Sequence, residues 1–295
     1  PVLPDPNGSA SLVYGLYPVN MLFLTSMPTI TYKTSLIHYL WLGNGRNILL
    51  CLHGYGESAA SFQFLQPHLP PEYALLAIDL PFHGQTQWHE DLSFTASDLI
   101  KIIDAIRVQH THNYGNLTLL GFSMGGRIAL QLLQQMPEKI NRLILLAPDG
   151  LKVNFWYWLS TQTAIGNKLF RYTMRHPQWF FFMLSISNRL RLINQSIYKF
   201  IRYYLHDGTA RRLLYERWTC LNSIRPKLVS IKKIIHKFQV PVRLLYGKYD
   251  RIILPKRGEK FRDGIESFCT LQVIQAGHQL LQEKHVQDII RLLQS

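Results

Sequence analysis

Cysteine is scarce in this chain, and its positions argue against two kinds of site. The three residues, Cys51, Cys220 and Cys269, lie far apart and form no CxxC pair. A sparse, odd count argues against a disulfide framework and favours a reducing compartment, so we predict a cytoplasmic location. The sequence also lacks the spacings of metal ligands, so neither a metal nor an organic cofactor is expected.

Long apolar runs are missing as well. The longest cluster is Trp179–Leu184, whereas a membrane-spanning helix needs about 20 apolar residues. No transmembrane segment is therefore predicted. Residues 1–28 lack the basic stretch and the longer apolar run of a signal peptide. We predict that they form an extension before the fold begins near Thr29.

Acidic residues are few where basic residues gather. Residues 151–227 hold thirteen Lys or Arg but only Asp207 and Glu216 as acids, a net of +11 out of +14 for the whole chain. This charge is either a solvated face or a site for an acidic acyl carrier protein, an anionic membrane surface or a polyanionic substrate. Nucleic acid is not expected, because no binding motif accompanies the charge.

Short apolar runs alternate with helical patterns along the rest of the chain. Predicted strands cover residues 47–52, 73–80, 116–120, 142–146, 240–246 and 270–274. Predicted helices cover residues 93–109, 127–136 and 284–293. This alternation predicts an α/β fold with a mostly parallel central sheet flanked by helices. Ligands of such sheets bind beyond the carboxyl ends of the strands.

A candidate nucleophile, Ser123, lies between a predicted strand and a predicted helix. The run GFSMG at 121–125 has the pattern G-x-S-x-G in the strand–turn–helix context that this pattern requires. Glycines fit there because side chains beside the sharp turn would clash, and the turn exposes the serine hydroxyl. The competing interpretation is a glycine-rich turn whose serine only caps the helix.

A base and a carboxylate follow two later strands. His278 ends the run AGH after the last strand, and Asp250 ends the run YGKYD after the strand before it. The chain order Ser, Asp, His is the order found in the α/β-hydrolase fold. Asp149, which follows the strand 142–146, is an alternative carboxylate, although the run PDG also fits a simple turn.

A glycine-rich run, HGYG at 53–56, follows the first predicted strand. Its position relative to Ser123 predicts an oxyanion hole built from the backbone N–H groups of Tyr55 and Met124. Gly54 and Phe122 adjoin these donors and are expected to contact substrate. A plain glycine turn is the alternative.

Four motifs together resemble the α/β-hydrolase superfamily from about Thr29 to the end of the chain. They are HGYGES, DLPFHGQT, GFSMGGR, and YGKYDRI followed by AGH. The resemblance implies a core of residues 29–150 and 228–295 with serine chemistry of the esterase or thioesterase type. One departure is Phe82, where many relatives have glycine. Relatives that use aspartate as nucleophile are excluded because Ser123 holds that position.

Residues 151–227 fall where this fold typically carries a helical cap. They contain the aromatic runs FWYW at 155–158 and WFFFML at 179–184. These side chains either line an apolar pocket, with Trp158 as a candidate substrate contact, or bury the cap against the main domain.

The leading hypothesis is a serine hydrolase that cleaves a carboxylic ester or thioester through an acyl-enzyme on Ser123. The run GFSMGGR also resembles the menaquinone-pathway synthase that eliminates pyruvate, and this resemblance implies that Arg127 holds a substrate carboxylate. The alternative for Arg127 is a helix residue bonded to its own structure. A ligand receptor on a hydrolase scaffold is the third hypothesis.

Overall fold

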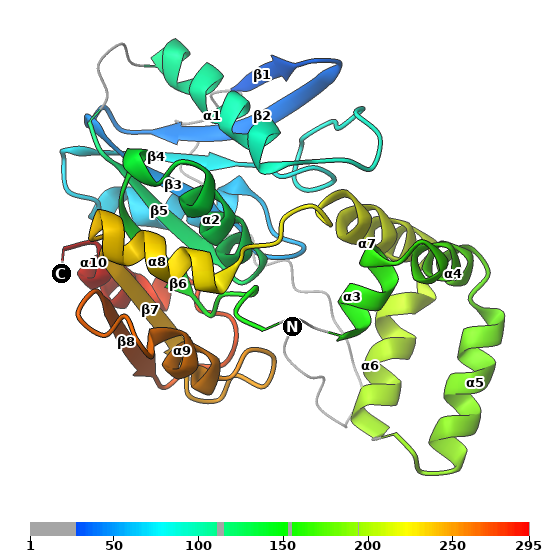
Figure 1. Ribbon diagram of the computed structural model, residues 1–295. Coiled ribbons are helices and arrows are strands. Elements are labelled where there is room, and N and C mark those ends of the chain that lie inside the picture. The colour runs from blue at the N-terminus through cyan, green and yellow to red at the C-terminus, as the bar shows by residue number, and fades with distance from the viewer. Residues whose placement is uncertain (1–27, 111–114, 153–154, 194, 295) are drawn as a thin grey trace.

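A computed structural model describes residues 28–110, 115–152, 155–193 and 195–294. The predicted extension, residues 1–28, therefore lies outside the described residues except for its last position. The described chain forms a central sheet with helices on both faces and a group of further helices beside one end of the sheet (Figure 1).

Within these described ranges, eight strands form one sheet in the order β1-β2-β4-β3-β5-β6-β7-β8. Their bounds are β1 (Thr29–Tyr32), β2 (Ser35–Leu42), β3 (Asn47–Leu52), β4 (Tyr73–Ile78), β5 (Leu117–Phe122), β6 (Ile140–Leu146), β7 (Val242–Gly247) and β8 (Cys269–Ile274). The pairs β1/β2 and β2/β4 are antiparallel, and every other neighbouring pair is parallel. The predicted mostly parallel sheet is confirmed.

Several strand ends differ from the prediction by one or two residues, and for two of them the local reason is clear. The strand predicted to reach residue 80 ends at Ile78, because Asp79 turns the chain: its carboxylate accepts the N–H groups of Ala59 at 2.6 Å and Gln85 at 2.8 Å. Strand β5 continues to Phe122, beyond the predicted end at residue 120, because its ladder with β6 runs on to that residue. Strands β1 and β2 were not predicted.

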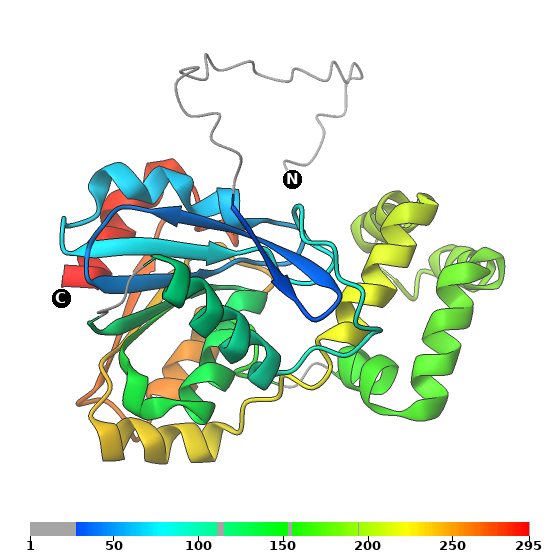
Figure 2. The same ribbon diagram turned by 90° about the horizontal axis from the view of Figure 1, so that it is seen from above.

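Helices cover both faces of the sheet (Figures 1 and 2). One face carries α1 (Ala96–His110), α2 (Met124–Gln135) and α8 (Leu228–Phe238). The other carries the 3-10 helix η1 (Ala59–His68) and α10 (Val286–Gln294), which follows the short turn η3 (Glu283–His285). The helix α9 (Pro255–Arg262) packs against β7 and β8, and the turn η2 (Pro137–Lys139) precedes β6.

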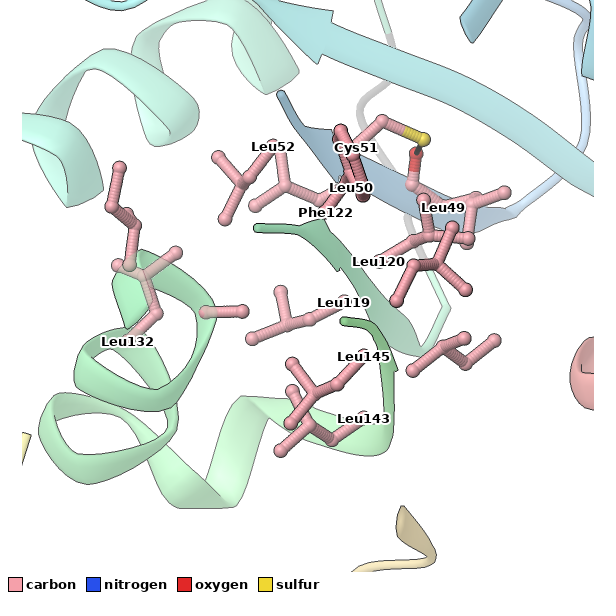
Figure 3. Packing of buried hydrophobic residues seen from close by; sticks show 14 of the residues in the cluster. Leu49, Leu50, Cys51, Leu52, Leu119, Leu120, Phe122, Leu132, Leu143 and Leu145 are labelled. Atoms are coloured by element: carbon pink, nitrogen blue, oxygen red, sulfur yellow. Dashed lines mark hydrogen bonds between the residues drawn. The ribbon is translucent and has the colours of Figure 1, made fainter. Parts of the chain in front are cut away.

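The core lies where β3, β5 and β6 meet α2. Leu50 and Cys51 of β3, Leu119 of β5 and Leu143 of β6 are fully shielded from solvent (Figure 3). Because both faces of these strands are covered, their sequences are continuous apolar runs, which is why their strands could be predicted. Cys51, Cys220 and Cys269 are free thiols in buried positions.

In the described part of the chain between β6 and α8 there are five helices. They are α3 (Phe155–Gln162), α4 (Ala164–Arg175), α5 (Gln178–Arg189), α6 (Gln195–His206) and α7 (Gly208–Cys220). We call them the inserted helices. Both views place them beside one end of the sheet, with α5 farthest from it (Figures 1 and 2).

Candidate active site

Ser123 occupies a strained turn between β5 and α2. Its φ of 49° and ψ of −114° lie outside the ordinary regions for a residue with a side chain, a conformation that costs about 1–3 kcal/mol. The neighbouring glycines make the turn possible. A Cβ on Gly121 would lie 2.6 Å from the carbonyl oxygen of Gly125, and a Cβ on Gly125 would lie 1.8 Å from that of Leu52.

His278 and Asp250 meet Ser123 at the carboxyl ends of the strands. The Nε2 atom of His278 lies 3.1 Å from the hydroxyl oxygen of Ser123, and its Nδ1 lies 2.7 Å from Oδ2 of Asp250. A carboxylate can only accept, so Nδ1 carries the proton and Nε2 is free to accept one from the serine. The three side chains form one hydrogen-bonded chain.

Asp250 is held as an anion. Its side chain has no exposed surface, and burial by itself would raise the pKa of this carboxyl group. The hydrogen bond from His278, the N–H groups of Ile253 and Ile252 and the nearby imidazole outweigh burial, so the pKa of Asp250 is lowered from its ordinary value. An ionised Asp250 fixes the tautomer of His278 that the serine needs.

Asp149, the alternative carboxylate, lies elsewhere. Its Oδ2 is 3.7 Å from Nε of Arg127, and its backbone N–H donates to the carbonyl oxygen of Ser123 at 2.8 Å. Of the two candidate carboxylates, Asp250 is the one that contacts His278.

The loop after β3 lies against the start of α2. A Cβ on Gly125 would lie 2.8 Å from the carbonyl oxygen of His53, besides its clash with Leu52. Met124 is the first residue of α2, so its N–H has no acceptor within the helix. The structure thus brings the segment that carries Tyr55 next to the start of the helix that carries Met124.

Sequence comparison supports one family. Residues 47–284 match the sequence model of a family described as alpha/beta hydrolase fold. The chain belongs to the α/β-hydrolase family.

Relatives of known sequence or structure agree with this assignment, and as a member of the family the chain is a hydrolase. The uncharacterized hydrolase YugF of Bacillus subtilis (strain 168) is 26% identical over 84% of this chain and 91% of its own. A thioesterase domain from the curacin biosynthetic pathway superposes with a TM-score of 0.59 at 19% identity, covering 91% of this chain and 98% of its own. A carboxylesterase structure from the ammonia-oxidizing thaumarchaeon Nitrososphaera gargenis superposes with a TM-score of 0.61 at 16% identity, covering 90% of this chain and 96% of its own.

Within this hydrolase, two buried histidines support the loop after β3. The Nδ1–H of His53 donates to the carbonyl oxygen of Gly54 at 2.8 Å, and its Nε2 accepts the N–H of Leu80 at 3.1 Å. Burial lowers the pKa of His53 to about 4 and that of His83 to about 2. Both rings are therefore neutral at neutral pH. His83 lies in the turn after β4, and its ring centre is 5.0 Å from that of His53.

Glu57 and Gln279 form a link that the sequence analysis did not assign. One oxygen of Glu57 accepts the N–H of Gly54 at 3.0 Å, and the other accepts the side-chain amide of Gln279, the residue after His278. Burial raises the pKa of Glu57, although the bonds from Gln279 and Gly54 and the nearby His278 oppose the rise. The link ties the β3 loop to the loop that carries His278. The sequence gives one signal for this link: Glu57 lies within the motif HGYGES, and Gln279 directly follows the motif AGH.

The predicted substrate contacts have different surroundings. Phe122 is buried and its ring centre lies 5.4 Å from that of His278, and a Cβ on Gly54 would lie 2.9 Å from the Phe122 ring. Both residues therefore adjoin the Ser123 site. Trp158 on α3 is 42% exposed.

Arg127 is buried and engaged by the protein itself. Its guanidinium lies 4.6 Å from the ring centre of Tyr157 and, as noted, faces Asp149. Neither contact is a hydrogen bond, and the buried Nε of Arg127 has no hydrogen-bond partner among the described residues. The substrate-carboxylate role implied for Arg127 stays a prediction.

Arg217 of α7 connects the inserted helices to the candidate site. Its Nε–H donates to the carbonyl oxygen of Phe82 at 2.9 Å, and its guanidinium lies 5.1 Å from the ring centre of Tyr55. Phe82 has a φ of 62°, a value that favours glycine and explains why many relatives have glycine there. Arg217 therefore holds both the Phe82 turn and the side chain of Tyr55.

The described residues contain no group of three or more His, Cys, Asp or Glu arranged to hold a metal ion. Among the same residues, no helix has both the length and the apolar character that crossing a membrane requires.

Proposed function

We propose that this hydrolase cleaves a carboxylic ester or a thioester through an acyl-enzyme on Ser123. The observation that carries the proposal is the chain of two hydrogen bonds, 3.1 Å from Ser123 to His278 and 2.7 Å from His278 to Asp250. In the family to which the chain belongs, a serine at this turn is the nucleophile. The similar structures include a thioesterase domain and a carboxylesterase, which supports this substrate class.

The proposed first half-reaction forms the acyl-enzyme. Nε2 of His278 takes the hydroxyl proton while the oxygen of Ser123 attacks the carbonyl carbon. Asp250 stabilises the imidazolium that results. The tetrahedral oxyanion accepts hydrogen bonds from the backbone N–H groups of Tyr55 and Met124. When the carbon–oxygen or carbon–sulfur bond breaks, the leaving alcohol or thiol takes the proton from Nε2.

The second half-reaction releases the acid. A water molecule gives a proton to Nε2 of His278 as its oxygen attacks the acyl carbon, and the returned proton restores the hydroxyl of Ser123. We propose residues 151–227 as a cap over this site, because Arg217 and Tyr157 of the inserted helices contact the core beside it. Gly54 and Phe122 would then lie along the acyl group, and Trp158 would contribute from the cap.

The test is hydrolysis of p-nitrophenyl esters from acetyl to palmitoyl by the wild type and by Ser123→Ala. We expect turnover with a chain-length optimum for the wild type and its loss in the variant. The matched control is Ser93→Ala, the same substitution at an exposed loop serine, which should retain full activity. A fluorophosphonate probe should add one adduct to the wild type and none to Ser123→Ala.

Two results would contradict the proposal. One is hydrolysis that survives Ser123→Ala, which would place the nucleophile elsewhere. The other is a wild type that neither hydrolyses any ester nor reacts with the probe. Ligand binding without turnover would then favour a receptor, and pyruvate release from the menaquinone precursor would favour a lyase.

A further inference from the structure

Helix α5 carries its apolar side chains on the outside. Four large side chains of α5, together with that of Leu190 directly after its end, follow the i, i+3, i+4, i+7 and i+11 pattern and so lie on one side of the helix. Their exposed fractions are 40% for Trp179, 65% for Phe182, 51% for Met183, 37% for Ile186 and 62% for Leu190. We call these residues the α5 face. An ordinary amphipathic helix turns such a face toward the core.

The opposite side of α5 is partly polar. There Leu184 is buried, while Ser185 and Asn188 are half-buried. The hydroxyl of Ser185 donates to the carbonyl oxygen of Phe181 at 2.8 Å and lies 3.4 Å from the hydroxyl of Tyr198 on α6. The half-buried Phe181 is on this side too, with its ring centre 5.2 Å from the guanidinium of Arg202 on α6. The inner side of α5 is thus a mixture of polar and apolar groups, while a second set of large apolar groups faces away. Figures 1 and 2 place α5 on the side of the inserted helices that is remote from the sheet.

The neighbouring helix α4 repeats the arrangement. Ile165, Leu169 and Tyr172 lie at spacings of four and three residues and are 82%, 53% and 56% exposed. Two consecutive helices that each expose an apolar face present more apolar surface to solvent than singly scattered surface residues do. A surface of this kind in a soluble protein marks a contact site.

Cations surround these apolar faces. The exposed basic residues on α4, at the end of α5, just after α5 and on α6 are Lys168, Arg171, Arg175, Arg189, Arg191, Lys199 and Arg202. Residues 151–227 contain only two acids against thirteen Lys or Arg. One of them, Asp207, already caps α7 by accepting the N–H of Ala210 at 2.6 Å. Helices α4 and α5 therefore both combine exposed apolar side chains with exposed basic ones, in a segment whose net charge is strongly positive.

We propose that the α5 face, together with the exposed apolar residues of α4, binds the surface of an anionic lipid bilayer. Aliphatic and aromatic side chains enter the boundary between headgroups and acyl chains, where Trp and Tyr are favoured. Lys and Arg beside them meet the anionic headgroups. An acidic carrier protein would match the charge, but its polar surface would leave Phe182, Met183 and Leu190 without an apolar partner.

Vesicle sedimentation tests the proposal with the full chain carrying Ser123→Ala, so that turnover plays no part. Binding is measured to phosphatidylcholine vesicles with and without phosphatidylglycerol. We expect binding that requires phosphatidylglycerol and a partition coefficient at least about tenfold lower in Phe182→Glu. The matched control is Val229→Glu on α8, an apolar residue 73% exposed on the core, which should bind like the parent. Met183→Glu is the second variant, and circular dichroism verifies the fold of each.

Several results would overturn the proposal. They are absence of binding to phosphatidylglycerol vesicles, equal losses in Phe182→Glu and Val229→Glu, and a self-association that Phe182→Glu abolishes. Capture of an acidic acyl carrier protein through the same face, without vesicle binding, would also overturn it. Labelling of Ser123 by the fluorophosphonate probe is read separately on the wild type, so failure of membrane binding leaves the proposed hydrolase activity intact.

Discussion

The substitution Asp250→Asn should remove about four orders of magnitude from kcat while leaving the fold in place. Oδ1 of Asp250 accepts the N–H groups of Ile252 at 2.7 Å and Ile253 at 2.9 Å. Of the two ends of an asparagine amide, only the oxygen fits beside two donors. The NH2 group must then face Nδ1 of His278. In the wild type this nitrogen lies 2.7 Å from Oδ2 of Asp250.

That orientation forces His278 into the other tautomer. Nδ1 becomes an acceptor, and Nε2 carries a proton where it should accept one from Ser123, 3.1 Å away. A loss of about ten-thousandfold corresponds to about 5.5 kcal/mol of activation free energy. Because both backbone bonds to position 250 survive, we expect only a small change in Tm.

The assay is kcat on a short p-nitrophenyl ester, with Asp149→Asn as the matched control. Asp149 undergoes the same chemical change, but it faces Arg127 rather than His278, so the control should keep most of its activity. The reasoning is refuted if Asp250→Asn keeps more than about a tenth of the wild-type kcat, a loss of only about 1.4 kcal/mol. It is equally refuted if Asp149→Asn is the variant that loses activity.

Three further predictions concern the loops around Ser123. Phe82→Gly should be more stable than Phe82→Ala by about 1 kcal/mol in chemical unfolding, because only glycine adopts a φ of 62° without strain; equal stabilities would contradict this. The folded pKa of Glu57 is raised, so its contribution to stability is present at low pH and is lost as the pH rises from about 4 through the folded pKa. The Tm of Glu57→Gln should therefore fall less than the Tm of the wild type as the pH rises from acidic to neutral. A Tm difference between the two proteins that stays constant with pH would contradict this by showing that Glu57 does not titrate in that range. Arg217→Ala should lower kcat about tenfold with little change in KM, because it loosens the Tyr55 loop; a raised KM at constant kcat would indicate a substrate contact instead.

The parallel part of the sheet could be predicted because its strands are buried on both faces. Asn47–Leu52 was predicted to the residue, and its six positions form a nearly continuous apolar run. Strand β2 could not be predicted in the same way because it contains a buried polar residue, His38. That histidine bonds to Asp79 at 2.6 Å across 41 residues of chain, a partner that no local pattern identifies. Helix α8 was also missed, although its buried Ile231 and Ile235 have helical spacing.

The three candidate catalytic side chains could be predicted because each follows a parallel strand, and such strands end at one edge. The residues that hold them in place could not. Glu57 meets Gln279 across 222 residues of chain, and Arg217 meets Phe82 across 135. Such contacts depend on how the inserted helices and the loops are folded together, which spacing does not encode.

Several aromatic side chains of residues 151–227 are exposed to solvent and are not buried against the main domain, which was one of the two arrangements expected from the sequence. Trp156 is 71% exposed, and Phe155 and Phe182 are 60% and 65% exposed. Helical spacing reveals that a helix has an apolar face, but the spacing is the same whether that face points inward or outward. Only the packing of α5 on α6 decides the direction, and it places Ser185 inside and Phe182 outside.

The direction of the α5 face has an energetic consequence. Burying a large apolar side chain completely is worth about 1.5–3 kcal/mol, and the five side chains of this face are between 37% and 65% exposed. About half of their burial energy, roughly 5 kcal/mol in all, is therefore unrealised in water. That amount is comparable to the lower end of whole-domain stabilities, about 5–15 kcal/mol. A bilayer that covered the face would recover this energy, whereas a purely electrostatic partner would not. This difference is why the Phe182→Glu comparison, rather than salt dependence alone, distinguishes membrane binding from general attraction to anions.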